Sequence, residues 1–209
     1  MKYDSTTNII VLGESDTGKT TLIYNYLYKN LNTRDNITTI GIDYYKKVLY
    51  NNNKSYLLNI YDTGNGLLYR NILDFYLRKS KIFIIVLRTN SFRFVNEVFE
   101  MINMDNKINP CHIFIVCNKN RDAIGLTFNE NEIFKHTPKD SKIHFSYINL
   151  LDKHKVETFF HNLSRYIFDN SIIKKTSLVP LNIKDNTIPE KKKYKTNKSF
   201  CENCFCNIC

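Results

Sequence analysis

The chain carries Gly13-Glu14-Ser15-Asp16-Thr17-Gly18-Lys19-Thr20 directly after the apolar run of residues 9–12, and a helical stretch of residues 21–27 follows. The spacing Gly-x4-Gly-Lys-Thr between a strand and a helix is the pattern of a phosphate-binding loop. Backbone N–H groups and the positive end of the new helix attract phosphate, the lysine reaches the outer phosphates, and the threonine hydroxyl binds Mg²⁺. The pattern predicts a nucleoside triphosphate site at residues 13–20, with Thr21 beside it.

Asp16 is the unusual residue of this loop, because it puts a carboxylate near phosphate charge. We expect it to weaken nucleotide retention unless its side chain points to solvent.

Length and composition predict one α/β domain followed by a tail. The chain has 209 residues, of which 43% are hydrophobic, enough for a full core. Apolar runs of 18 residues are absent from the sequence, and its first residues carry neither a secretory segment nor the glycine at position 2 that N-myristoylation needs. We therefore expect a cytosolic protein.

Strands and helices alternate along the chain, which predicts a six-stranded, mainly parallel sheet with helices on both faces. The expected strands are 8–12, 43–50, 55–61, 82–87, 112–117 and 143–146, the second and third forming an antiparallel hairpin across residues 51–53. The expected helices are 19–29, 67–79, 92–103, 129–136 and 152–168. Helical periodicity stops after Asn170, so we place a domain at 1–169 and a flexible basic tail at 170–209.

The tail holds a large share of the net charge of +10. Residues 170–209 contain eight lysines against three carboxylates, which gives +5. Such a tail is a solvated flexible linker, an arm that binds nucleic acid, or a segment that is attracted to anionic lipid. Only Tyr194 and Phe200 could stack on bases there, and the terminal cysteines have no place in a nucleic-acid arm, so we expect no nucleic-acid partner.

From residue 8 to about residue 168 the order of motifs resembles a Ras-superfamily small GTPase, and specifically a Rab protein. Residues 38–44 resemble the first switch, Ile60-Tyr61-Asp62-Thr63 the entry to the second, and residues 69–70 and 76–78 the elements that follow. The resemblance implies the P-loop NTPase fold, bound GTP or GDP, and Mg²⁺ held directly by Thr20 and Thr39 and through water by Asp62. It implies catalytic roles for Lys19 and Thr39, and an effector surface formed by Ile40, Tyr44, Tyr61 and Tyr76.

Three motifs depart from this pattern. Without a gap, Asn65 replaces the glycine that contacts the γ-phosphate and Gly66 replaces the glutamine that orients water, so intrinsic hydrolysis should be very slow. Asn118 and Lys119 match the guanine-reading motif, but Arg121 stands where its carboxylate belongs, and an arginine accepts no hydrogen bonds. Either Asp122 serves from the next position or base specificity is relaxed. Near residues 145–148 the family's Ser-Ala-Lys motif, which also contacts the base, keeps at most its serine.

The chain ends with four cysteines in nine residues. Rab proteins receive geranylgeranyl groups on terminal cysteines, and the resemblance implies lipid on Cys206 and Cys209. One lipid chain anchors a protein marginally, and a second chain or a basic segment makes the anchoring stable. The alternative is zinc, because Cys-x2-Cys-x-Cys-x2-Cys could supply four thiolates, although one residue between the pairs leaves little chain to surround a metal.

The resemblance implies a monomeric GTP/GDP switch in vesicle traffic. It would act on the cytosolic face of an endomembrane with effector, exchange-factor and prenyl-escort proteins. The alternative is a pseudo-GTPase that uses the same surface as a binding scaffold and does not cycle nucleotide. The residues that favour the first interpretation are Lys19, Thr20, Thr39 and Asp62. Those that favour the second are Asp16, Asn65, Gly66 and Arg121.

Overall fold

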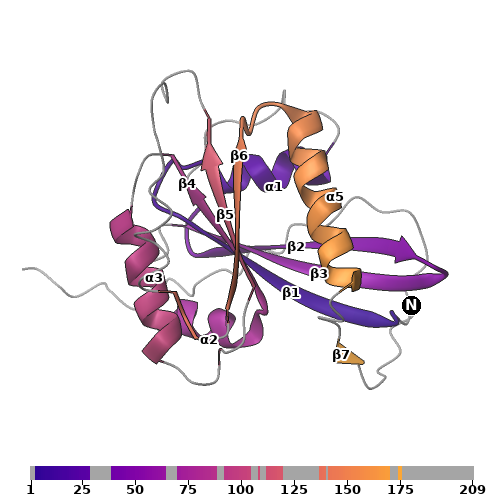
Figure 1. Ribbon diagram of the computed structural model, residues 1–209, viewed down its shortest axis with the longest axis horizontal. Coiled ribbons are helices and arrows are strands. Elements are labelled where there is room, and N and C mark those ends of the chain that lie inside the picture. Colours follow the sequence, from indigo (N-terminus) through magenta and orange to yellow (C-terminus); the bar gives the residue numbers. More distant parts are fainter. Residues whose placement is uncertain are drawn as a thin grey trace, which may run out of the picture.

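The computed structural model in Figure 1 describes residues 3–28, 39–64, 70–88, 92–104, 108, 112–119, 137–139, 141–169 and 174–175. Strands and helices alternate in the described part of the chain. The strands are β1 Ser5–Leu12, β2 Ile42–Asn51, β3 Lys54–Thr63, β4 Ile82–Leu87, β5 His112–Asn118, β6 Lys142–Ile148 and β7 Lys174–Lys175. The helices are α1 Lys19–Leu27, α2 Arg70–Lys79, α3 Phe92–Met104 and α5 Lys153–Asp169. The helix expected at 129–136 lies outside the described residues.

The strands form one sheet in the order β2-β3-β1-β4-β5-β6. Strands β1, β3, β4, β5 and β6 run parallel, and β2 pairs with β3 in antiparallel fashion. This confirms the predicted six-stranded, mainly parallel sheet. Because parallel strands end at the same edge, the segments that follow β1, β3, β5 and β6 come together there.

Helices cover both faces of the sheet, as predicted. On one face, alternate residues such as Ile9 and Val11 pack with α1 and α5. On the other face, their neighbours Ile10 and Leu12 pack with α2 and α3. The six residues of β4 are all buried, because a central parallel strand covered on both sides has no face for polar side chains.

The β2–β3 hairpin has the short connection that its sequence predicts. Asn51 pairs with Lys54, so Asn52 and Asn53 alone make the turn. Both have positive φ values, 48° and 58°, which asparagine tolerates better than most residues.

The two-residue strand β7 lies beyond the predicted domain limit at residue 169. Its residues Lys175 and Lys174 pair with Ser5 and Thr6 of β1 in antiparallel fashion. Strand β4 pairs only with residues 9–12 of β1, so the beginning of β1 has an edge that β7 can use. The backbone at 174–175 is thereby attached to the sheet, while a tail over the remaining residues stays a prediction.

Candidate functional site

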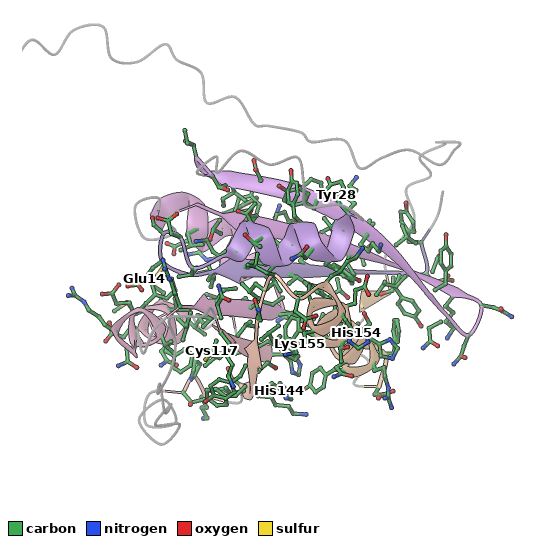
Figure 2. The ribbon with its side chains drawn as sticks, turned by 90° about the horizontal axis from the view of Figure 1, so that it is seen from above. Glu14, Tyr28, Cys117, His144, His154 and Lys155 are labelled. Atoms are coloured by element: carbon green, nitrogen blue, oxygen red, sulfur yellow. The ribbon has the colours of Figure 1, made fainter. Side chains whose placement is uncertain are left out.

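The loop of residues 13–20 connects β1 to α1 at the carboxyl edge of the parallel strands. Its residues 14–16 are exposed, whereas Thr17 and Lys19 are buried. The hydroxyl of Thr17 donates to the carbonyl of Glu14 at 3.1 Å, which closes the loop on itself. In Figure 2, Glu14 and Cys117 of β5 lie toward one side of the view, and Tyr28 after α1 lies away from them.

Asp16 adopts a left-handed backbone conformation with φ 59°. Only glycine adopts this region freely, and a non-glycine residue there costs roughly 1–2 kcal/mol. Its exposed carboxylate still acts on Lys19, since it is one of the charges that oppose the lowering of the Lys19 pKa. The residue therefore combines solvent exposure with a negative potential over the loop.

Lys19 lies under the loop, with 7% of its surface exposed. Its ammonium group donates to the carbonyls of Gly13 at 2.9 Å and Glu14 at 2.7 Å. Burial lowers its pKa, and the charges of Asp62, Asp16 and Glu14 oppose that shift. An ammonium has three donors, so one more can reach a phosphate oxygen.

Thr20, Thr39 and Asp62 come together from three segments of the chain. The hydroxyl of Thr20 donates to Oδ2 of Asp62 at 2.7 Å and lies 3.1 Å from the hydroxyl of Thr39. Asp62 is fully buried at the end of β3. Hydroxyl and carboxylate oxygens are the ligands that Mg²⁺ prefers, so these three residues fit that ion.

Gly64 holds the segment of Thr39 against the end of β3. Its N–H donates to the carbonyl of Gly41 at 2.8 Å. A Cβ atom at position 64 would lie 2.3 Å from the carbonyl oxygen of Thr39, a distance that real Cβ atoms do not adopt. The segment of Thr39 and Gly41 thus meets the end of β3 through a position that has no room for a side chain.

Asn118 connects the end of β5 to the phosphate loop. Its Nδ2 donates to the carbonyl of Thr17 at 3.1 Å, and its Oδ1 accepts from the N–H of Leu150 at 3.5 Å. The N–H of Lys119 donates to the carbonyl of Ile148 at 2.8 Å.

The segment that meets Asn118 and Lys119 is therefore 148–150, which lies beyond Ser146, the serine that the sequence interpretation assigned to the Ser-Ala-Lys motif. Ser146 pairs with Val116 inside the sheet, two residues before the edge. Leu150 is the site residue that the sequence interpretation missed. It is 1% exposed, and its carbonyl accepts a hydrogen bond from Nδ2 of Asn25 in α1. No local motif marks it, since its neighbours come from residues far away in the sequence.

The three tyrosines of the predicted effector surface form one continuous aromatic row. The ring of Tyr61 lies 5.4 Å from that of Tyr44 and 4.7 Å from that of Tyr76, measured between centroids. The hydroxyl of Tyr44 donates to Oδ1 of Asn59 at 2.6 Å and fixes that end of the row. Ile40 is 82% exposed in the segment that precedes β2.

Other predicted residues are described only in part. Ser15 is exposed and Thr21 is half-buried. Asn65, Gly66, Arg121, Asp122, Cys206 and Cys209 lie outside the described residues. Within the described ranges, no group of three or more His, Cys, Asp or Glu side chains is placed to hold a metal ion. Among the helices that the structure describes, none is both long and apolar enough to cross a membrane.

Comparison with known proteins agrees with this geometry. Residues 8–122 match the family model described as Ras of Complex, Roc, domain of DAPkinase. The Ras-related protein Rab-11B of Dictyostelium discoideum is 28% identical over 193 residues, which cover 89% of this chain and 84% of that protein. The Ras-related protein Rab-3A of Homo sapiens is 33% identical over 84 residues, covering 40% of this chain and 38% of that protein.

Proposed function

Because the chain belongs to the Roc and Ras family of GTPase domains, we propose that it is a Rab-like switch in intracellular vesicle traffic, with slow or impaired GTP hydrolysis. The observation that carries the proposal is the meeting of Thr20, Thr39 and Asp62 beside the buried Lys19. A switch needs a terminal phosphate that holds two loops, and these residues come from both loops and from the phosphate-binding helix.

In this mechanism the phosphate loop binds the nucleotide and Lys19 donates to its outer phosphate oxygens. Thr20, Thr39 and Asp62 would hold Mg²⁺ through their hydroxyl and carboxylate oxygens. The ion, when bound, neutralises charge on the β- and γ-phosphates. Thr39 links nucleotide state to shape, because its hydroxyl meets Thr20 while its carbonyl oxygen faces Gly64.

The ordered segments then present the aromatic row of Tyr44, Tyr61 and Tyr76, together with the exposed Ile40, to effector and exchange-factor proteins. Support comes from the ring contacts of the three tyrosines and from the exposure of Ile40. Aromatic residues with a polar end are common at such interfaces.

Hydrolysis is proposed to be slow because Gly66 supplies no side chain to orient water. Asn118 and Lys119 are proposed to face the base, with Asp122 pairing to guanine if the loop shifts by one residue. A pseudo-GTPase is the second candidate, and the negative potential of Asp16 over the loop favours it.

The tail is proposed to receive prenyl groups on Cys206 and Cys209 after escort by a prenyl-binding protein. The protein would then attach peripherally to the cytosolic face of an endomembrane as a monomer. Terminal cysteines behind a run of lysines support this proposal, because lipid and basic charge together make anchoring stable.

Nucleotide content tests the first part of the proposal. Purified protein with Mg²⁺ is incubated with labelled GTP, GDP or ATP, and bound nucleotide and released phosphate are measured. We expect GTP and GDP to bind and phosphate release to be slow, and Lys19→Ala to abolish binding. GTP retention without turnover would indicate a locked switch. The switch proposal fails if the parent protein binds no nucleotide, or if Lys19→Ala binds as well as the parent.

Mass spectrometry of the C-terminal peptide from a eukaryotic host tests the anchor. Prenyl groups on Cys206 or Cys209 are expected. Unmodified thiols with bound zinc would overturn the membrane proposal.

A further inference from the structure

Basic residues gather at the amino ends of the parallel strands, on the edge opposite the phosphate loop. Lys81 precedes β4, His112 begins β5 and Lys142 begins β6. The N–H of His112 donates to the carbonyl of Lys81 at 2.9 Å, and His112 is in register with Lys142. These three residues are therefore neighbours across adjacent strands.

Helix α2 adds a fourth basic residue and an exposed aromatic ring. The carbonyl of Lys79 accepts a hydrogen bond from Nδ2 of Asn8 at 2.9 Å, which places the end of α2 beside the same edge. The ammonium of Lys79 lies 3.8 Å from the ring centroid of Phe75, whose side chain is 52% exposed. We call Lys79, Lys81, His112 and Lys142 the amino-end basic edge.

The positive charges of this edge add to the same local electrostatic potential. Lys79 and Lys142 are exposed and Lys81 is half-buried, and none of the three forms an ion pair with another described side chain. Burial lowers the pKa of His112, and the nearby positive charges of Lys142, His144 and Lys81 lower it further, so the imidazole is neutral near pH 7 and the three lysines carry the charge of the edge. The edge is therefore a site of positive potential that favours an anionic partner.

Of the described carboxylates, one on a covering helix lies toward this end of the sheet: Asp169 ends α5, the helix whose Tyr166 hydroxyl lies 2.8 Å from Nδ1 of His112. Glu14, Asp16 and Asp62 lie at the opposite, carboxyl edge. Asp4 lies near the amino edge, but on the β1–β3 side, where its carboxylate accepts hydrogen bonds from Ser55. The basic edge spans β4 to β6 and is separate from that carboxylate.

Strand β7 brings the start of the tail to the same end of the sheet. Lys174 pairs with Thr6 and Lys175 with Ser5, upstream of the Asn8 that contacts Lys79. Figure 1 shows β7 and the starts of β5 and β6 toward the lower side of the view. The chain continues from residue 175 with six more lysines and the four terminal cysteines.

We propose that the amino-end basic edge is a docking surface for an anionic lipid bilayer. The proposal rests on the membrane attachment proposed above. Lysines beside an exposed aromatic ring suit the boundary between head groups and acyl chains. Docking through this edge directs the phosphate loop, at the other edge of the sheet, away from the lipid.

Vesicle binding by the unlipidated full-length protein tests the docking surface. Cosedimentation is measured with vesicles of phosphatidylcholine alone and with 30% phosphatidylserine, in 0.1 M salt. The test variant is Lys79→Gln, Lys81→Gln, Lys142→Gln. Each lysine near an anionic membrane contributes about 1 kcal/mol, so the variant should bind the anionic vesicles between about tenfold and 150-fold more weakly.

The matched control is Lys46→Gln, Lys153→Gln, Lys155→Gln, which removes the same charge from residues away from this edge. It should lose less than about threefold in vesicle affinity. Equal losses in the two triple variants would overturn the docking surface, because binding would then depend on net charge alone. The proposal also fails if the test variant loses binding to a double-stranded oligonucleotide but keeps its vesicle affinity.

GTP binding is measured on the same samples. Both triple variants should bind nucleotide as the parent does, which shows that they are folded. Absence of nucleotide in all three proteins would count against the switch proposal but not against the lipid-binding result. If the two triple variants bind vesicles equally and bind GTP normally, the docking surface is rejected and the switch proposal is not.

Discussion

Replacing Gly64 by alanine should uncouple Thr39 from Thr20 and Asp62, the proposed Mg²⁺ ligands, without unfolding the domain. The backbone of Gly64 is outside the left-handed region, so alanine can adopt it. The new Cβ would lie 2.3 Å from the carbonyl oxygen of Thr39, and at least 0.7 Å of movement is needed to reach 3.0 Å. The obstacle is a backbone atom, so a change of side-chain rotamer cannot relieve the clash.

The segment that moves is the one that carries the Thr39 hydroxyl. That hydroxyl lies 3.1 Å from the hydroxyl of Thr20, and a shift of this size takes it out of reach of a shared ion. An interaction with a charged group is worth about 1.5–3 kcal/mol, which corresponds to a loss of about 10- to 150-fold in Mg²⁺-dependent GTP affinity. Affinity in EDTA should not change, because Lys19 and the phosphate loop are untouched.

Gly41→Ala is the matched control, because it makes the same chemical change in the same pair of segments. A Cβ atom at position 41 meets nothing within 4 Å, although its φ of +78° strains any side chain by roughly 1–2 kcal/mol. That strain lowers the free energy of unfolding and leaves Thr39 in place. GTP affinity is measured by titration of a fluorescent analogue with Mg²⁺ and with EDTA, and stability by thermal melting. The reasoning is refuted if Gly64→Ala keeps its Mg²⁺-dependent affinity, or if Gly41→Ala loses as much.

Three further predictions concern stability. Asn118→Ala removes the amide that bridges Thr17 and the segment at 148–150, and the buried groups left without partners should lower the free energy of unfolding by about 1–3 kcal/mol in urea denaturation. Acidification should destabilise the domain, because burial lowers the pKa values of His112 and His144, and the unfolded chain therefore binds more protons than the folded one below pH 6.5. Thermal melting at pH values from 8 to 5 should show this loss of stability. The loss should be smaller in a variant with glutamine at both positions. Burial raises the pKa of Tyr26 to about 12, so the stability that the protonated tyrosine gives below pH 10 should be lost as the pH rises above 10. Between pH 9 and 11 the melting temperature of Tyr26→Phe should therefore fall less than that of the parent protein.

The sheet could be predicted from the sequence because its signals are local. Strand β4 has the predicted bounds 82–87. Its residues form a continuous apolar run, which is typical of a strand that is buried on both faces. Strand β1 begins at Ser5 and not at residue 8, because its polar first residues are held by pairing with β3. Strand β7 was not predicted, since two lysines carry no strand signal and the pairing depends on the edge that β1 offers.

In the candidate site, too, the residues of a local motif could be predicted, and the residues that only the fold brings together could not. Lys19 and Thr20 belong to one contiguous motif, and their positions follow from the strand, loop and helix around it. Leu150 could not be found, because its contacts with Asn118 and Asn25 exist only once β5, β6 and α1 are assembled. The left-handed backbone of Asp16 was equally hidden, since aspartate gives only a weak preference for that conformation.

Tyr61 and Asp62 are consecutive residues of β3, and successive side chains of a strand point to opposite faces. The carboxylate of Asp62 is bonded to Thr20 in the interior, while the ring of Tyr61 stands between Tyr44 and Tyr76. A rotation of the peptide unit between Tyr61 and Asp62 would therefore move the Asp62 carboxylate and the Tyr61 ring together. In the proposed switch, a change at the nucleotide would reach the outside of the protein through one peptide unit, because Asp62 on the inside and Tyr61 on the outside are consecutive residues.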